Sequence, residues 1–337
     1  MIVCYHRSSS LGTLEFCEQK YFLQYNLSLK DSTNKKALMG TIVHKALQIL
    51  GDKKLCMARG NKSFTDDELG KFTLKQCDDL PKVTERAFNY YTENFPDVTL
   101  DKAELKICTK WTEKAVAYSD GAFDPRNQNV FSTEQFFDIE IDKPWARYDY
   151  RIGKERITGN LSIKGTVDLI IKHDENYYEI LDYKTGKRIN WATGEEKTPE
   201  ALQKDTQLLL YYYALKNMYP EAEFYVSIFY INSGGVFSLV FDEDDYNKAE
   251  EILKKKFQYI KNKEHPKLLS NENSHWKCRK LCLFSEPYKE GSKKSVCQHM
   301  RDEIRLKGIN KVVEQYGNIE KIYTYGDGGG RLAEKKK

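Results

Sequence analysis

Two apolar runs separated by a short polar turn constrain the fold of this 337-residue chain more than any other feature. Residues 165–171 and residues 177–186 are both rich in Val, Ile, Leu and Tyr, and the polar residues 173–176 lie between them. Two runs of this length and composition on either side of a turn predict an antiparallel hairpin.

The hairpin carries two carboxylates and a lysine. Side chains alternate faces along a strand, so Asp182 and Lys184 should share one side of the second strand. Asp168 lies on the partner strand, where pairing would bring its carboxylate close to Asp182. Magnesium prefers oxygen ligands, so both carboxylates could hold one Mg²⁺ ion, with Lys184 directed at a phosphate group. A surface ion pair on an exposed face is the alternative interpretation.

Two predicted helices carry further polar residues. Residues 40–50 have apolar side chains at helical spacing, which predicts an amphipathic helix bearing His44. A second helix is expected from about 199 to 218, with Gln207 and Tyr211 one turn apart on the same face. Taken alone, His44 would be read as a satisfied core histidine, and the pair Gln207 and Tyr211 as helix packing.

In chain order, four short segments resemble the motifs of the RecB-like branch of the PD-(D/E)XK nuclease superfamily: Gly40-x-x-x-His44, Gly165-x-x-Asp168, Asp182-x-Lys184 and Gln207-x-x-x-Tyr211. The resemblance spans most of residues 10–300. It implies that Asp168 and Asp182 are metal ligands and that His44 is a metal ligand or another active-site residue. It also implies that Lys184 is the catalytic lysine, and that Gln207 and Tyr211 support the site or touch DNA.

The resemblance further implies an α/β fold with an αβββαβ core, in which helices flank a central mixed sheet. Strands are expected at 134–141, 224–231 and 236–241 besides the hairpin, and a basic helix at about 244–261. Residues 51–130 would form a helical insertion that shapes or gates the DNA path, although residues 66–91 carry no chemistry that we can identify. Glu134 is a further acidic candidate, but alternation along its strand predicts a solvated side chain. We expect one domain over residues 1–325 and a disordered tail over 326–337.

Cysteines at the two ends of the chain form a second pattern. Cys17, Cys278, Cys282 and Cys297 could supply thiolates to a [4Fe–4S] cluster or to one tetrahedral metal ion. A zinc site built from the three late cysteines with His299 or Cys17 is an alternative, and free buried thiols are another.

These cysteines, with the nuclease motifs between them, resemble the iron–sulfur nucleases of the AddB and CRISPR-associated RecB-like groups, in which the cluster joins the two ends of the chain. The resemblance implies that residues 262–310 close onto Cys17. The chain departs from the usual pattern, because Cys278 and Cys282 are separated by three residues instead of two.

Positive charge is concentrated near the late cysteines. Residues 252–310 contain 15 Lys or Arg against 6 Asp or Glu, although the net charge of the whole chain is only +4. This region could hold a phosphate backbone, and its aromatic side chains could stack on unpaired bases. The alternative is a solvated helix face with its aromatic residues packed inward.

Together these patterns predict a Mg²⁺- or Mn²⁺-dependent, single-strand DNA exonuclease of recombination, repair or replication. An endonuclease for branched DNA would use the same residues, and a non-catalytic DNA-binding subunit is a further alternative. The chain has no phosphate-binding loop of a motor ATPase, so a helicase or recombination protein is an expected partner. No apolar run approaches the ~20 residues of a membrane span. No secretory signal is recognisable either, and we expect an intracellular protein.

Overall fold

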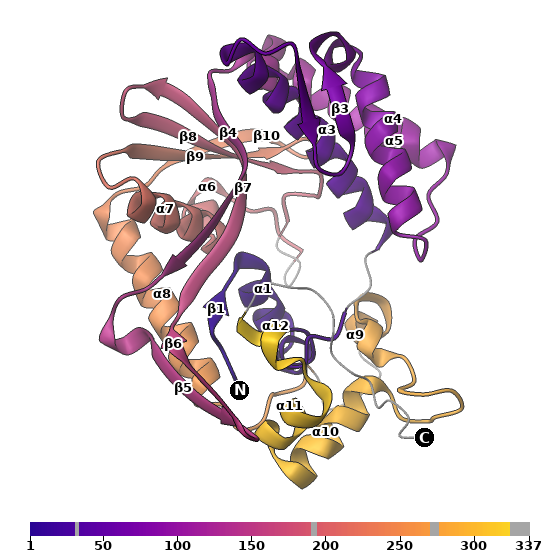
Figure 1. Cartoon of the computed structure of the whole chain (residues 1–337), viewed down its shortest axis with the longest axis vertical. Helices are drawn as coiled ribbons and strands as arrows, with labels where there is room; N and C mark the ends of the chain where they lie inside the picture. The colour runs from indigo at the N-terminus through magenta and orange to yellow at the C-terminus, as the bar shows by residue number, and fades with distance from the viewer. Residues whose placement is uncertain (31–33, 190–193, 270–275, 324–337) are drawn as a thin grey trace. The chain divides into compact units, whose positions relative to one another are not determined.

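The computed structural model describes residues 1–30, 34–189, 194–269 and 276–323 (Figure 1). The chain forms two compact units, each assembled from segments far apart in the sequence. The first unit contains residues 1–32, 138–165 and 247–337, and the second contains residues 33–137 and 166–246. Whether residues 1–325 fold as one domain stays a prediction, and the predicted tail at 326–337 lies outside the described residues.

A mixed β-sheet forms the centre of the fold, as predicted. Its strand order is β1-β7-β8-β9-β10, and β4 also pairs with β7. The pair β7 and β8 and the pair β9 and β10 are antiparallel, whereas β1 runs parallel to β7 and β8 runs parallel to β9. The strands are β1 (Tyr5–His6), β4 (Val130–Glu140), β7 (Ser162–Asp174), β8 (Tyr177–Lys184), β9 (Glu223–Tyr230) and β10 (Gly235–Val240).

The predicted hairpin is confirmed in its pairing and in its alternation. Leu169 pairs with Leu181 and Ile170 with Ile180, so the same register puts Asp168 level with Asp182 one residue further on. Leu169 and Leu181 are buried in the apolar core of the second unit. Because side chains alternate along each strand, Asp168 and Asp182 share a face with each other.

Helix α3 (Lys35–Ala58) packs on the apolar face of the sheet and continues the predicted helix around His44 in both directions. The expected helical insertion contains α4 (Leu80–Asn94) and α5 (Lys102–Ala117), which pack against α3 (Figure 1). It also contains a hairpin of β2 (Ser63–Asp66) and β3 (Gly70–Thr73), so the expectation of helix alone was incomplete.

The helix expected at 199–218 is interrupted. The structure has α6 (Pro199–Leu202) and α7 (Thr206–Met218), and the Asp205 side chain accepts a hydrogen bond from the Gln207 backbone N–H at 3.0 Å. An aspartate in this position stabilises the start of a new helix, because it satisfies a backbone donor that has no partner in the first turn. The predicted helix is thus divided into α6 and α7, and the cap at Asp205 starts α7 just before Gln207.

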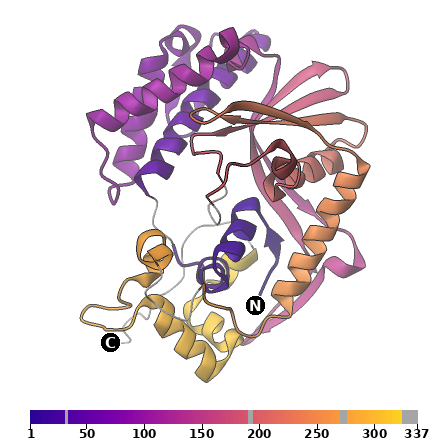
Figure 2. The same ribbon diagram turned by 180° about the vertical axis from the view of Figure 1, so that it is seen from behind.

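The first unit combines a second hairpin with the two ends of the chain. Figure 2 shows the long helix α8 running beside the hairpin, and the Lys261 side chain donates to the Arg147 carbonyl oxygen at 2.9 Å. Its remaining elements are α1 (Ser8–Phe16), α2 (Glu18–Tyr21), β5 (Arg147–Ile152), β6 (Glu155–Asn160), α8 (Glu243–Lys261), α9 (Trp276–Leu281), α10 (Val296–Lys307), α11 (Ile309–Tyr316) and α12 (Ile319–Tyr323).

Helices therefore flank a central mixed sheet, as the sequence predicts for this α/β fold. Within the described ranges, no helix has both the length and the apolar character that a bilayer span requires.

Candidate active site and cysteine cavity

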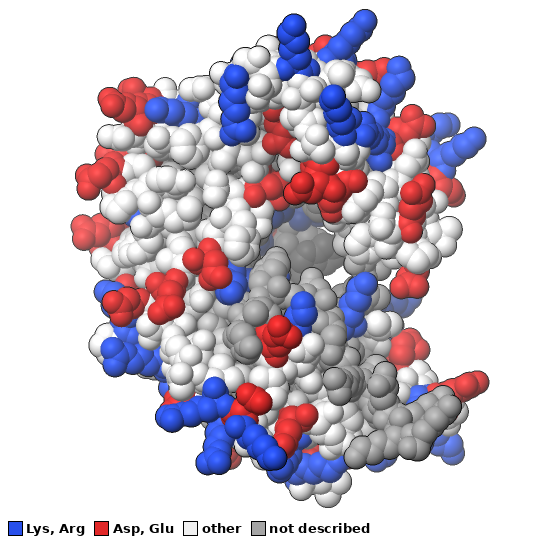
Figure 3. All heavy atoms as spheres, in the orientation of Figure 1, with Lys and Arg blue, Asp and Glu red and all other residues white. Residues whose placement is uncertain are grey.

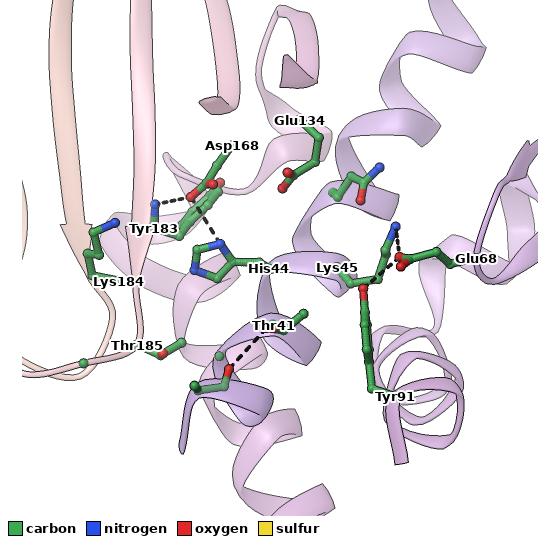
Figure 4. Close-up of a pocket in the computed structure, with 14 residues that line it drawn as sticks. Thr41, His44, Lys45, Glu68, Tyr91, Glu134, Asp168, Tyr183, Lys184 and Thr185 are labelled. Carbon is green, nitrogen blue, oxygen red and sulfur yellow. Dashed lines mark hydrogen bonds and ion pairs between the residues drawn. The ribbon is translucent and has the colours of Figure 1, made fainter. Parts of the chain in front are cut away.

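A pocket of about 620 Å³ in the second unit is lined by residues of three of the four nuclease-like motifs (Figure 4). Helix α3 contributes one stripe of side chains at helical spacing, and β4, β7 and β8 contribute the facing side chains. Gly40 of this stripe approaches the segment after β8 so closely that a β-carbon there would lie 2.9 Å from Thr185 Oγ1. The glycine at this position therefore lets α3 come close to the strand that carries Lys184.

Three potential metal ligands meet in the pocket. One ligand atom each from His44, Glu134 and Asp168 lies within 4.8 Å of the other two. His44 Nδ1 is 3.3 Å from Asp168 Oδ2, which also accepts the Tyr183 backbone N–H at 2.7 Å. Figure 4 shows His44 below Asp168 and Glu134 to its right. The backbone N–H of Tyr183 on β8 thus fixes the carboxylate of Asp168 on the neighbouring strand β7.

Glu134 reaches this cluster through an unusual backbone conformation. Its φ of 43° lies in the left-handed region, which is rare for residues other than glycine, asparagine and aspartate. The regular alternation that predicts a solvated side chain fails at such a residue, and Glu134 instead lines the pocket. Burial and the neighbouring Asp168 charge raise the pKa of the Glu134 carboxyl to about 7. A strained backbone that brings a carboxylate to other ligands is typical of functional sites.

Asp182 lies in a second network beside the first. Its Oδ2 is 2.6 Å from Lys184 Nζ, and its Oδ1 accepts from Gln207 Nε2 at 2.9 Å and from the Tyr211 hydroxyl at 3.3 Å. Gln207 Nε2 also donates to the Tyr211 hydroxyl oxygen at 2.6 Å. Such a contact is expected for side chains one helical turn from each other. The structure thus brings together the six site residues predicted from the four motifs, but divides them between two adjoining networks.

The charges of the two networks influence one another. Burial raises the pKa of the Asp168 carboxyl, but the charge and hydrogen bond of His44 outweigh burial, and the net pKa falls below its ordinary value. Burial and the charge of Asp168 outweigh the ion pair with Lys184, so the pKa of Asp182 is raised. For Lys184, burial lowers the pKa, yet the charges of Asp182 and Asp168 raise it overall. Adjacent buried carboxylates of this kind favour a bound cation.

The cluster of His44, Glu134 and Asp168 fits a hard divalent cation. Carboxylate oxygens suit Mg²⁺ and Mn²⁺, and an imidazole nitrogen is a common further ligand of transition metals. Asp182 is not part of this cluster of His44, Glu134 and Asp168. Its carboxylate instead contacts Lys184, Gln207 and Tyr211. Its role as a metal ligand therefore stays a prediction.

Replacing Glu134 tests this ligand set directly. Glu134→Gln should weaken Mn²⁺ binding by about tenfold or more, because an amide oxygen replaces a charged ligand. Without metal, the melting temperature should stay the same or rise, since an unfavourable buried charge is removed. Isothermal titration with Mn²⁺ and thermal unfolding would measure both effects. Glu93→Gln, an exposed change on α4, is the control, and equal Mn²⁺ affinity in both variants would contradict the assignment.

The four predicted cysteine ligands line one cavity of about 400 Å³ in the first unit. Cys17 lies between α1 and α2, Cys278 lies on α9 with Cys282 directly after that helix, and Cys297 lies in the first turn of α10. Burial and the proximity of the other three cysteines raise the pKa of the Cys297 thiol to about 12. Without a cation, the Cys297 thiol therefore stays protonated at neutral pH.

The spacing of the thiols bears on which metal centre they fit. Ligands of a single tetrahedral zinc ion, at about 2.3 Å from the metal, lie about 3.8 Å apart. No three of the four described thiol sulfur atoms lie within 4.8 Å of one another. His299 stacks on Tyr288 with a ring separation of 4.1 Å and is not among the residues that line the cavity. Within the described residues, the four thiols are therefore not arranged as the ligands of one zinc ion.

The pocket also contains residues for which the sequence gives no functional signal. Lys45 follows His44 on α3, Glu68 lies in the turn between β2 and β3, and Tyr91 lies on α4. They contact one another across three elements, and such contacts leave no local pattern.

A family model matches most of the chain. The family model described as "PD-(D/E)XK nuclease superfamily" matches residues 8–286, a range that ends before Cys297. No curated protein matches the sequence. The solved structure of a "Putative exonuclease" from Eubacterium rectale has a TM-score of 0.45 and 13% identity, covering 82% of this chain and 87% of that chain. The solved structure of SSO0001 has a TM-score of 0.27 and 16% identity, covering 70% of this chain and 92% of that chain.

Proposed function

The chain belongs to the PD-(D/E)XK nuclease superfamily, and we propose that it is a divalent-metal-dependent DNA nuclease that degrades single strands from their ends. One observation carries the proposal. Lys184 and the cluster of His44, Glu134 and Asp168 line the same pocket. A lysine ammonium group and a set of potential metal ligands therefore face the same space. Exonuclease action on single strands, in recombination, repair or replication, is the finer part of the proposal.

Each residue would have a distinct task in phosphodiester hydrolysis. His44, Glu134 and Asp168 would hold Mg²⁺ or Mn²⁺, with Asp182 as a further ligand. When bound, the cation supplies an activated water molecule and neutralises charge on the phosphate. Lys184 would donate a hydrogen bond to a phosphate oxygen and stabilise the negative charge that develops there.

Gln207 and Tyr211 would act through Asp182. Both side chains donate hydrogen bonds to its Oδ1, which fixes the carboxylate beside Lys184. The Asp205 cap holds the start of α7 and thereby the position of Gln207. These contacts support a positioning role for α7.

We further propose a [4Fe–4S] cluster in the cysteine cavity, held by Cys17, Cys278, Cys282 and Cys297. The charged residues of the cavity support an anionic group, because four of them are basic and one is acidic. These residues are Lys20, Arg279, Lys293, Lys294 and Glu286. Such a cluster would tie the N-terminal helices to the C-terminal helices of the first unit. Zinc is the alternative metal, and the wide thiol spacing speaks against it.

The charge distribution supports DNA as the substrate. Figure 3 shows Lys and Arg side chains along the end of the first unit that holds β5, β6, α10 and α11, with Asp and Glu side chains among them. A strand could contact these cations through its phosphates. The chain would work inside the cell, where its eight free cysteines remain reduced, together with a helicase or recombination protein that unwinds its substrate.

End-labelled single-stranded and duplex DNA, incubated with Mg²⁺ or Mn²⁺, test the proposed function. Wild-type protein purified without oxygen should cleave the single strand and lose that activity when the metal is chelated. Lys184→Met should lower kcat by about 10²–10³-fold, the loss typical of removing one stabilising donor, whereas the exposed Lys187→Met should not.

The products separate the alternatives. Release of short products from linear DNA, with circular single strands left intact, supports an exonuclease, whereas cutting of circles indicates an endonuclease. DNA binding without cleavage by the wild type would contradict the catalytic proposal.

A further inference from the structure

The pocket has a second wall that the proposed chemistry does not use. Glu68 lies opposite the metal-ligand cluster in Figure 4, between Lys45 and Tyr91. The Tyr91 hydroxyl donates to Glu68 Oε2 at 2.7 Å, and Lys45 Nζ is 2.6 Å from the same oxygen. Two donors on one oxygen fix the direction of the Glu68 carboxylate.

The turn that carries Glu68 is itself held in place. Asp66 Oδ1 accepts the backbone N–H groups of Glu68 at 3.1 Å and Leu69 at 2.7 Å, while its Oδ2 is 3.1 Å from Lys45 Nζ. An aspartate that accepts backbone donors two and three residues ahead stabilises a turn. Arg86 on α4 donates to the Lys71 carbonyl oxygen at 3.0 Å and so binds the same hairpin.

The charge of this wall is negative. The single positive charge of Lys45 is matched by two carboxylates, Asp66 and Glu68, and Lys45 and Asp66 are both largely buried. The Tyr91 hydroxyl and Lys45 both bind Oε2 of Glu68, and within the described ranges no residue binds its Oε1. A fixed carboxylate oxygen in a pocket accepts a hydroxyl or amine donor and repels a phosphate group.

We propose that Glu68 selects the chemical form of the strand end that enters the pocket, accepting a terminal hydroxyl and excluding a terminal phosphate. The inference rests on the proposed nuclease function. If the scissile phosphate lies at the cluster of Asp168 and at Lys184, the wall with Glu68 faces the nucleotide beyond it. A continuing strand, or an end with its own phosphate, would bring a second phosphate group towards this carboxylate.

The size of the pocket agrees with a terminal nucleotide. Its volume of about 620 Å³ lies in the range of roughly 300–1,000 Å³ that small-molecule sites occupy. The hairpin and α4 close one side of it with Glu68 and Tyr91, so the strand would end there. Glu68 is therefore a specificity-determining residue for substrate ends.

Four single strands of one sequence test the inference, carrying hydroxyl or phosphate at either the 5′ or the 3′ end in all combinations. The wild type should cleave hydroxyl ends about tenfold faster than phosphate ends at one of the two termini, measured as kcat/KM, since like charges in contact are strongly unfavourable. Glu68→Gln should reduce this ratio to about twofold or less, mainly because phosphate ends are cleaved faster.

Asp67→Asn is the matched control, because it removes the same charge from an exposed neighbour in the same turn and should leave the ratio unchanged. Tyr91→Phe removes one donor to Glu68 and should lower the ratio partway, which tests the inference even if Glu68→Gln fails to fold. Equal rates for both kinds of end in the wild type, or an unchanged ratio in both variants, would overturn it. No cleavage of any strand would instead refute the nuclease function itself.

Discussion

Asp168→Asn should lower the rate of DNA cleavage by about 10³-fold or more while leaving the protein folded. Asp168 lies at the centre of the first network, since it contacts His44, accepts from the Tyr183 backbone and belongs to the metal-ligand cluster. Asparagine keeps the shape and can still accept the Tyr183 N–H, but it lacks the charge that a divalent cation requires. The loss should therefore exceed that from Lys184→Met, because the metal supplies both the water and the charge stabilisation.

Single-turnover cleavage, DNA affinity and thermal unfolding would be measured side by side. DNA affinity should stay equal or rise, because a negative charge that faces phosphate is removed. Glu175→Gln is the control, since it removes an exposed carboxylate from the turn of the same hairpin. Cleavage by Asp168→Asn at the rate of this control would mean that the pocket is not the active site.

The local part of the fold could be predicted from the sequence. The hairpin of β7 and β8 follows from two β-rich runs with a polar turn, and its period of two determines which residues share a face with Asp182. The helix around His44 follows from its apolar spacing, which positions the histidine over the sheet. These elements depend on neighbours in the chain, so their patterns are visible in the sequence.

The rest depends on contacts or conformations that leave no periodic pattern. Glu134 enters the pocket because its φ is positive, and nothing in the alternation of β4 indicates this. The hairpin of β2 and β3 consists of two strands of four residues each, too short to stand out in a stretch with helical composition. The break before α7 depends on the cap at Asp205. The segments before and after Asp205 both have helical spacing, so the spacing does not indicate a break between them.

The cysteine cavity combines both situations. The positions of the four cysteines in the sequence predict one shared metal centre, although Cys17 and Cys297 are far apart in the sequence. Their common cavity depends on how α1, α2, α9 and α10 pack in the first unit, and only the structure reveals it. A metal centre at this point would link segments that lie far apart in the sequence, so its contribution to stability should be large.

Cys297→Ser should therefore remove the iron and much of the stability of the first unit. The thiol of Cys297 is influenced by all three of the other cysteines, so its loss should disrupt the whole centre. We expect protein purified without oxygen to lose its brown chromophore and its bound iron, and to lose about 4 kcal/mol or more of unfolding free energy, as is typical when a structural metal is removed.

Cys56→Ser controls for the loss of a buried thiol, because Cys56 lies in the second unit, where its sulfur donates to the Asn61 carbonyl oxygen. Iron analysis, absorption spectra and limited proteolysis of the two variants would separate a metal centre from ordinary packing. Zinc in place of iron in the wild type would keep the four ligands and change the metal. Wild-type protein with neither metal, together with equal stability of the two variants, would contradict the metal centre and leave the cavity as a set of packed thiols. Only a bound centre would make the loss of stability larger for Cys297→Ser than for Cys56→Ser.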